Sequence, residues 1–243
     1  DGKLSRGLGD VYKRQAGPML RGNYKGKFLG SGSDGWKYWD ELRAGNISQK
    51  DWEEVETGIA RSYGHCMTMG TASTMTAIAE AMGLCLPGAS SIPAADSNHI
   101  RMSTNVGKRI VEMVWEDLTP RNIITENSIE NAVTVAMAMG CSTNAIIHLI
   151  AMARRASVNL TMDDLDKKGR KIPLIANIRP SGKDYLMEDF YYAGGILSLM
   201  CSLASQLNLE EITVSGMKLS ELIDGKETLN LDIIRPLDNP IYK

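Results

Sequence analysis

The chain has 243 residues, of which 43% are hydrophobic and 23% are charged, and its formal net charge is −2. This length and apolar content allow a large core in one domain or slightly more. The near-neutral charge does not indicate a nucleic-acid partner, and no apolar run of about 18 residues predicts a membrane span. The four cysteines are too few for a disulfide scaffold, and no signal segment is evident. We therefore expect a cytoplasmic protein, in which an unusual cysteine is a candidate for catalysis or metal binding.

Residues 1–15 (DGKLSRGLGDVYKRQ) differ from the rest of the chain, because they carry Gly-flanked basic stretches and no helical or strand period. We expect this segment to be a non-native or disordered leader. Its last six residues could be the translation of a transposon end that was joined to the coding sequence. An intact gene that encodes the same fifteen residues in frame would contradict that hypothesis.

The Gly-rich stretch that follows predicts a loop around one short strand, Lys27–Leu29. Ser48 followed by Asp51 resembles a capping box, and Gly64 is expected to stop the helix that this box begins. Gly83 is a natural left-handed end for the next helix. The helices predicted in this half are residues 36–44, 48–62 and 71–82.

In the second half, Ser97 and Ser128 are expected to cap two long helices, and Gly140 to close the second one. The helix after Gly140 is apolar almost all round, so we expect it to be buried. The predicted helices are residues 97–115, 128–139, 143–156, a short one opened by Thr161, 185–206 with a break at Gly194-Gly195, and 219–223. The predicted strands are residues 172–178, which should be buried, and residues 211–214.

Helices therefore dominate, with a few apolar strands between them, and this favours a layered α/β domain over a pure helical bundle. The domain should span residues 16–234. The sequence RPLDNP at 235–240 is rich in turn-forming residues, so residues 235–243 are expected to begin a linker. We also expect residues 195–207 to expose apolar surface where another domain would cover them.

Cys66 is the first candidate for chemistry, because it lies between two predicted helices, after His65 and before the small-residue run GTAST. A thiolate there would face the N-terminus of the following helix, whose N–H groups and dipole favour negative charge. Small residues also let the backbone approach a bulky group. The alternative is an inert buried cysteine, the commoner situation for a lone cysteine. His65 is a candidate for a supporting hydrogen bond to a cluster or substrate.

The run GCSTN at 140–144 is the second candidate, because Ser142, Thr143 and Asn144 place three polar side chains at a helix start. Simple N-capping is the alternative interpretation. Cys85 and Cys201 are expected in the core. His148 is interpreted as a hydrogen-bonded core histidine and His99 as an exposed one. The sequence has no CxxC pair, HExxH motif or P-loop.

Several motifs in order resemble the dihydroxy-acid dehydratase and 6-phosphogluconate dehydratase family. They are GHCMTMGTASTM (64–75), EAMGL (80–84), LPG (86–88), GKRIV (107–111), GCSTN (140–144), RPSGK (179–183), MED (187–189) and RPLDNP (235–240). The likeness covers nearly all of residues 16–243. The sequence around residue 66 and the motif IPAADS (92–97) are more similar to the sugar-acid dehydratases than to the valine–isoleucine pathway enzyme.

The resemblance implies a hydro-lyase with Mg²⁺ and an iron–sulfur cluster, [2Fe–2S] in preference to [4Fe–4S]. Three cysteines would hold the cluster, and its open iron would act as a Lewis acid on the departing C3 hydroxyl. Mg²⁺ would orient the carboxylate and the C2 hydroxyl while a base removes the C2 proton. The enol that forms would tautomerise to a 2-keto-3-deoxy acid. Both the leaving hydroxide and the weakly acidic proton need electrostatic help in the transition state.

Carried over by position, Cys66 matches the third cluster cysteine. The family's Cys-Asp-Lys motif, with its Mg²⁺ ligands, should lie upstream of residue 17, and an earlier cysteine also has no match. The serine thought to act as base belongs to a C-terminal stretch that has no match either. We therefore expect a helix-rich α/β N-terminal, cluster-binding domain truncated at both ends. This chain should be inactive by itself and should contain no catalytic base.

The substrate implied by the resemblance is a 2,3-dihydroxy acid, a pentonate or hexonate in preference to the 2,3-dihydroxy-3-methyl acid of branched-chain amino-acid biosynthesis. A non-catalytic α/β assembly module is the alternative from another class. The expected partners are a small hydroxy acid and further copies of the full-length enzyme, which should form a homo-oligomer. No nucleic-acid or membrane partner is expected.

Overall fold

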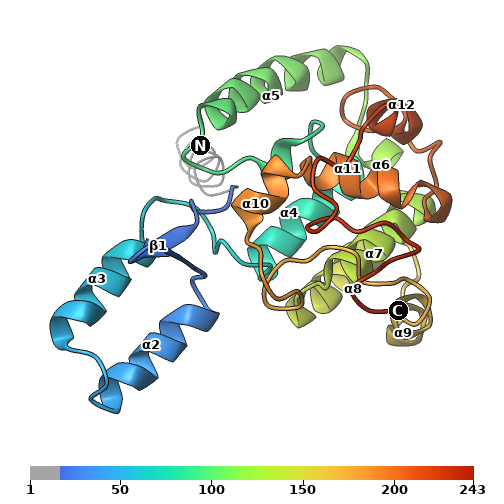
Figure 1. The fold of residues 1–243 in the computed structure, drawn as a ribbon. Coiled ribbons are helices and arrows are strands. Elements are labelled where there is room, and N and C mark those ends of the chain that lie inside the picture. Colours follow the sequence, from blue (N-terminus) through green and yellow to red (C-terminus); the bar gives the residue numbers. More distant parts are fainter. Residues whose placement is uncertain (1–16) are drawn as a thin grey trace.

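The computed structural model describes residues 17–243, and the leader expected at 1–15 lies outside the described residues. Helices make up most of the described structure, as Figure 1 shows. The one named sheet among these residues has two antiparallel strands, β1 (Gly22–Tyr24) and β2 (Lys27–Leu29), with Gly22 opposite Leu29. The strand predicted at Lys27–Leu29 is therefore confirmed.

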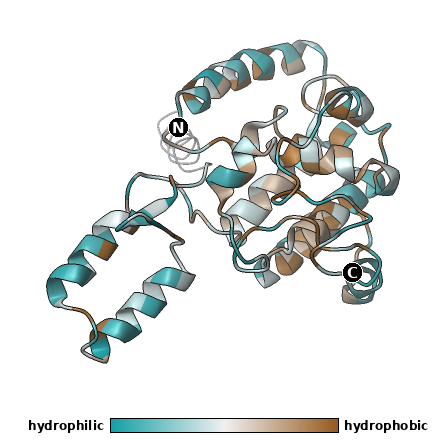
Figure 2. Ribbon diagram, in the orientation of Figure 1, coloured by the Kyte–Doolittle hydropathy of each residue, from teal (hydrophilic) through white to brown (hydrophobic). Residues whose placement is uncertain are grey.

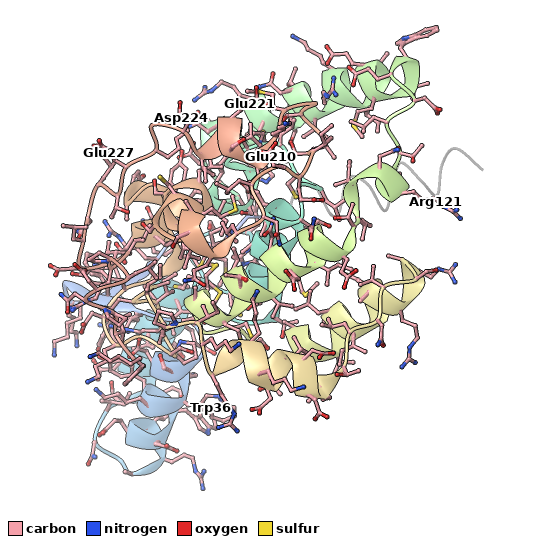
Figure 3. The ribbon with its side chains drawn as sticks, turned by 90° about the vertical axis from the view of Figure 1, so that its right-hand side faces the viewer. Trp36, Arg121, Glu210, Glu221, Asp224 and Glu227 are labelled. Carbon is pink, nitrogen blue, oxygen red and sulfur yellow. The ribbon has the colours of Figure 1, made fainter. Side chains whose placement is uncertain are left out.

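The two strands and the next two helices, α2 (Ser33–Arg43) and α3 (Gln49–Ile59), form an arm that extends from the rest of the molecule (Figure 1). Ser48 caps α3, and Asp51 completes the capping box, as the sequence predicts. Aromatic side chains join the two helices, since the rings of Trp39 and Trp52 meet edge to face at 5.3 Å. In the view of Figure 3, Trp36 on the arm lies at the bottom, at the opposite end from the labelled acidic residues Glu210, Glu221, Asp224 and Glu227.

The remaining elements form a body. They are α4 (Thr71–Ala81), η1 (Ala89–Ser91), α5 (Ser97–Trp115), α6 (Pro120–Ile123), α7 (Glu126–Met139), α8 (Thr143–Arg155), α9 (Met162–Gly169), α10 (Met187–Tyr192), α11 (Gly195–Ser202), η2 (Ala204–Gln206) and α12 (Leu219–Ile223). Hydrophobic residues gather in the middle of this body, whereas the arm is mostly hydrophilic (Figure 2).

Helices α4 and α7 form the central layer of the body because each contributes to two separate hydrophobic clusters. On one side they pack with α10, α11 and α12, through residues such as Phe190 and Leu199. On the other side Ile78 and Val133 pack with α8 and α9, through residues such as Leu149. The layered, helix-rich architecture predicted from the sequence is confirmed, with only a small sheet.

The predicted helix ends in the body are mostly correct, but two N-caps are wrong. Asp96, and not Ser97, accepts the first-turn N–H of α5. Thr125, and not Ser128, caps α7, whose third residue Ser128 bonds back to the cap. In each case the true cap is the residue just before the first helical residue, where its side chain can accept the free N–H groups of the first turn. Gly140 has a φ of 66° and closes α7 as predicted.

Residues 172–178 are mostly buried but do not form a strand among the described residues, so this prediction is wrong in type. The N–H groups of Ile175 and Ala176 both bond the carbonyl of Ala138, at 3.0 and 3.2 Å. The last carbonyls of a helix have no partner within it, and here the segment satisfies one from α7. Isolated bridges from Leu174 and Ala176 reach Tyr242 and Ile234, so the C-terminal segment packs against the body.

The strand predicted at 211–214 is also wrong. The chain makes a single bridge there, between Ile212 and Lys218, and then turns through Gly216, whose φ is 83°.

Helix α8 is less buried than the sequence predicts, since only three of its residues are buried and Ile147 is 68% exposed. Conversely, α11 is largely buried, so the apolar surface expected at 195–207 is not found there. No helix in the described part of the chain is long and apolar enough to cross a membrane.

Candidate functional site

The loop that carries Cys66 connects α3 to α4 and is fixed to the chain on two sides. On one side, His65 N–H bonds the carbonyl of Gly17 at 3.0 Å, and Met19 N–H bonds the carbonyl of His65 at 2.8 Å. Gly64 permits this approach, because its φ is 134° and a Cβ there would lie 2.7 Å from the Met19 nitrogen. The predicted role of Gly64 as a helix stop is wrong, since α3 ends at Ile59.

On the other side, the loop is held by the segment that precedes α10. Met69 N–H bonds the carbonyl of Arg179, and Met187 N–H bonds the carbonyl of Met67, both at 2.8 Å. Met67 and Met69 are 0% and 2% exposed, whereas Cys66 is exposed. The loop therefore buries its methionines as anchors and leaves the cysteine accessible, contrary to the alternative of an inert buried cysteine.

The first turn of α4 supports the Cys66 loop through Ser73, which is 1% exposed. Its hydroxyl donates to the carbonyl of Thr68 at 2.9 Å and lies 3.4 Å from the carbonyl of Cys66. The same hydroxyl lies 3.2 Å from Nδ1 of His65, which is also 3.0 Å from the Cys66 carbonyl. His65 therefore contacts the backbone of the loop and helps to fix its shape.

The same turn of α4 also holds the second candidate, the start of α8. The hydroxyls of Thr71 and Ser142 lie 3.0 Å apart, and the Asn144 amide donates to Thr71 at 2.9 Å. Ser142 N–H bonds the hydroxyl of Thr74 at 3.1 Å. Ser142 also caps α8, as the capping interpretation predicts, and Thr143 lies exposed in the first turn. The two sequence-predicted sites thus meet at one helix end, α4, through Thr71, which sequence reasoning missed.

The RPSGK motif braces this region from the α7–α8 side. The Ser181 hydroxyl donates to the carbonyl of Gly140 at 3.0 Å. Gly182 lies against the peptide bond between Asn177 and Ile178, since a Cβ at position 182 would fall 2.4 Å from the nitrogen of Ile178. Arg179 forms an ion pair at 2.7 Å with Asp34, which also accepts the N–H of Gly30. The motif therefore links the arm, the Cys66 loop and the start of α8. In the sequence, this role was indicated only by the resemblance of RPSGK to a motif of the family.

The remaining cysteines do not resemble metal ligands. Burial raises the pKa of Cys85 to about 12, with a further contribution from the carboxylate of Glu80, so its thiol stays protonated. Burial also raises the pKa of Cys141. Cys201 packs against the main hydrophobic cluster. Cys85 and Cys201, which the sequence places in the core, are therefore only half-buried.

The predicted roles of two histidines are wrong. His148 is exposed on α8 instead of lying in the core. His99 is half-buried in the first turn of α5, and this burial lowers its pKa. Neither lies in a metal-binding group, since the described residues contain no group of three or more His, Cys, Asp or Glu side chains that could hold a metal ion. Cys66, too, lies in no such group of the described residues.

Comparison with known proteins shows which proteins the chain resembles. Residues 14–222 match the family model described as dihydroxy-acid/6-phosphogluconate dehydratase N-terminal. A 6-deoxy-6-sulfo-D-gluconate dehydratase from Pseudomonas putida is 49% identical over 99% of this chain and 41% of its own length. An L-arabinonate dehydratase from Rhizobium leguminosarum is 43% identical over 93% and 39%, and a dihydroxy-acid dehydratase from Pyrococcus abyssi is 38% identical over 92% and 41%. The chain thus spans about two fifths of the length of these relatives.

Proposed function

The chain belongs to the dihydroxy-acid/6-phosphogluconate dehydratase family, within its N-terminal domain, and from this we propose that its protein is a hydro-lyase that dehydrates a 2,3-dihydroxy acid to a 2-keto-3-deoxy acid. One observation carries the proposal beyond the family match. The first turn of α4 holds both the loop of the exposed Cys66 and the polar start of α8. An exposed cysteine and polar side chains that can bind hydroxyl groups are thereby brought to one end of one helix.

We propose that Cys66 binds one iron of an iron–sulfur cluster, [2Fe–2S] in preference to [4Fe–4S]. Its exposed thiol fits one ligand position, whereas Cys85 and Cys141 are half-buried and have raised pKa values, which disfavours the thiolate form. When bound, such a cluster supplies a Lewis acid for a leaving hydroxyl. The bonds to residues 17, 19, 179 and 187 hold the Cys66 loop in place before any metal is bound.

The start of α8 is the proposed place for the polar part of the substrate. Thr143 and Asn144 are exposed there, and Thr71 positions the Asn144 amide. Ser142 is occupied as a cap, so its role is to orient this turn. His65 acts on the other side as a positioning residue for the backbone of Cys66. The family motifs that supply the Mg²⁺ ligands and the base have no match in residues 1–243. These groups are therefore proposed to lie in other parts of the protein.

The proposed substrate is a sugar acid, a pentonate or hexonate. Two relatives named for sugar acids are 49% and 43% identical to this chain, compared with 38% for the relative named dihydroxy-acid dehydratase. The branched-chain 2,3-dihydroxy-3-methyl acid is the second candidate. A non-catalytic assembly module is a third, and it predicts a stable protein that binds no iron.

The test uses the complete reading frame in which these residues lie, purified without oxygen. We expect Cys66→Ser to lose most of the iron, the visible cluster absorption and the release of 2-oxo acid, whereas Cys201→Ser keeps all three. A panel of aldonic acids and one 2,3-dihydroxy-3-methyl acid then identifies the substrate class. Full iron content and activity in the Cys66→Ser protein would exclude the proposal.

Residues 1–243 alone are proposed to be inactive, because Cys66 is the one residue here that matches a cluster ligand. After reconstitution with iron and sulfide, this chain should release no 2-oxo acid from any acid of the panel. Turnover above the level of a Cys66→Ser control would contradict this part of the proposal.

A further inference from the structure

A cavity of about 430 Å³ lies between α7, α9 and the loop that joins α8 to α9. This volume is within the range of sites that bind small molecules. The lining residues of α7 are Glu126, Ile129, Glu130 and Val133, and their spacing of three or four places them on one face of the helix. This face of α7 therefore forms one wall of the cavity, and α9 forms the other.

The α7 wall has an apolar floor and an acidic rim. Ile129 and Val133 are only 2% and 3% exposed, so they form the floor. Glu126 and Glu130 are exposed and four residues apart, a spacing at which like charges on a helix repel each other. The start of α7 favours negative charge at Glu126, but Glu130 lies beyond the first turn, where its carboxylate accepts the Asn208 amide at 3.1 Å. Neither carboxylate has a cationic partner within 4 Å among the described residues.

The α9 wall is basic. Lys167, Lys168 and Lys171 line it, with Lys168 half-buried and the other two exposed. Lys167 and Lys171 are four residues apart and repel each other in the same way. Asp164 also lies on this wall, but its carboxylate already accepts the N–H and the hydroxyl of Thr161, at 3.0 and 2.6 Å. In the part of the chain that the structure describes, none of the three lysines forms an ion pair.

Opposite charges thus line one cavity without pairing, and this arrangement restricts the ligand. A simple anion would meet the lysines but also two carboxylates, and a metal cation would meet the carboxylates but also three ammonium groups. A zwitterion satisfies both walls, because its ammonium can donate to Glu126 and Glu130 while its carboxylate accepts from the lysines. An apolar group on the same molecule would cover Ile129 and Val133, and its removal from water favours binding.

We propose that this cavity binds a free α-amino acid with an apolar side chain. In such a molecule one carbon carries the ammonium, the carboxylate and the side chain, so a single ligand can contact the acidic rim, the basic wall and the apolar floor. The site does not depend on the proposed dehydratase function. Glu126 lies roughly 21 Å from Gly140 along α7, at 1.5 Å per residue, so the cavity is separate from the candidate functional site. Amino-acid binding can therefore be measured in a protein that has lost its iron.

The first test is isothermal titration calorimetry of the complete protein with L-norleucine and three analogues that each lack one feature. Hexanoate lacks the ammonium, pentylamine lacks the carboxylate, and glycine lacks the apolar side chain. We expect L-norleucine to bind and each analogue to bind at least about tenfold more weakly, because each loses one of the three contacts. Hexanoate that bound as tightly as L-norleucine would show that the acidic rim takes no part, and this would overturn the proposal. So would the absence of L-norleucine binding at millimolar concentration.

The second test uses variants of the two walls. Glu126→Gln should weaken L-norleucine binding about fivefold, the upper range for an exposed ion pair, and should leave hexanoate binding unchanged. The double variant Lys167→Gln/Lys171→Gln should weaken the binding of both ligands, since both carry the carboxylate. The matched changes Glu54→Gln and Lys50→Gln, at exposed positions of the arm, should affect neither ligand. Circular dichroism checks that each variant is folded, and unchanged affinity in both wall variants would overturn the proposal.

Hydrogen exchange then locates the bound amino acid. Saturating L-norleucine should slow exchange in residues 158–171, which form the loop and the α9 wall, and should leave α2 and α3 unchanged. Protection confined to the Cys66 loop and the start of α8 would place the amino acid at the candidate functional site and overturn the proposal. Because iron content and 2-oxo acid release are measured separately, a failure of this site leaves the proposed dehydratase function standing, and the reverse also holds.

Discussion

Helix α4 in the body and helix α2 in the arm each have eleven residues, but they are held in different ways. Six residues of α4 are buried and its N-terminus has no side-chain cap, whereas α2 has no buried residue. Its neighbour α3 buries only Val55 and relies on a capping box and on aromatic contacts with α2. The difference indicates that the candidate site is built on the part of the molecule that burial makes rigid.

The test of this contrast with the largest expected effect is truncation of one side chain in each region. Ile78 of α4 is fully buried, so Ile78→Ala should lower the free energy of unfolding by about 2–5 kcal/mol, through lost apolar burial and the cavity that remains. Trp36 of α2 is 72% exposed, and Trp36→Ala should change it by about 0.5 kcal/mol or less. Urea unfolding measures both. Equal losses would show that the arm is as strongly packed as the body.

The second prediction concerns Glu80, a buried carboxyl at the end of α4. It accepts the N–H groups of Gly88 and Ser90 and thereby orders the loop before α5. Burial raises its pKa from 4.5 to about 7, although these hydrogen bonds oppose the shift. Since the carboxyl in the unfolded chain is ionised above about pH 4.5, the folded state binds the extra proton between about pH 4.5 and 7.

The free energy of unfolding should therefore fall as the pH rises through this window, in total by on the order of 3 kcal/mol, and then level off. Glu80→Gln should remove this dependence, because the amide does not titrate. It should also be less stable than the parent at pH 4.5, since one backbone N–H would face the amide NH₂ group. Urea titrations of both proteins across this range give the comparison, and parallel pH profiles would show that Glu80 is not responsible.

The sequence predicts the elements of both regions well where local chemistry decides them. The capping box at Ser48 and the left-handed ends at Gly83 and Gly140 depend only on neighbouring residues, and all three are found. Residues 172–178 were expected to form a strand, because an apolar run indicates burial but not what its N–H groups bond. Their partner, the carbonyl of Ala138, lies more than thirty residues away along the chain.

The candidate site shows the same division. Cys66 and the start of α8 could be selected from local context, but not the contact of Thr71 with Ser142 and Asn144, which joins residues about seventy positions apart. Likewise, nothing in the pattern pairs Arg179 with Asp34. Both side chains lie in segments where a charged residue at the surface is the ordinary expectation.

That ion pair is where the arm meets the body, and it gives the third prediction. Asp34 and Arg179 are only 19% and 23% exposed, and Asp34 also accepts the N–H of Gly30. Asp34→Ala should lower the free energy of local unfolding of the arm by about 1 kcal/mol, a value reduced because solvent partly screens the ion pair. Hydrogen exchange should speed up in α2 and α3 and stay unchanged in α4 and α7. If α4 exchange rose equally, the two regions would form one cooperative unit.

The smallest prediction acts inside the arm. The Ser48 hydroxyl accepts the N–H of Asp51 at 3.1 Å, and Asp51 in turn accepts the N–H of Ser48. Ser48→Ala should weaken α3 by roughly 0.5–1 kcal/mol, because first-turn N–H groups lose their partner, while Ser48→Thr should retain the cap. Exchange should increase in the first turn of α3 alone. Since Asp51 also pairs with Lys25 beyond β1, a loss that spread to β1 and β2 would show that this cap holds the whole arm together, and not one helix of it.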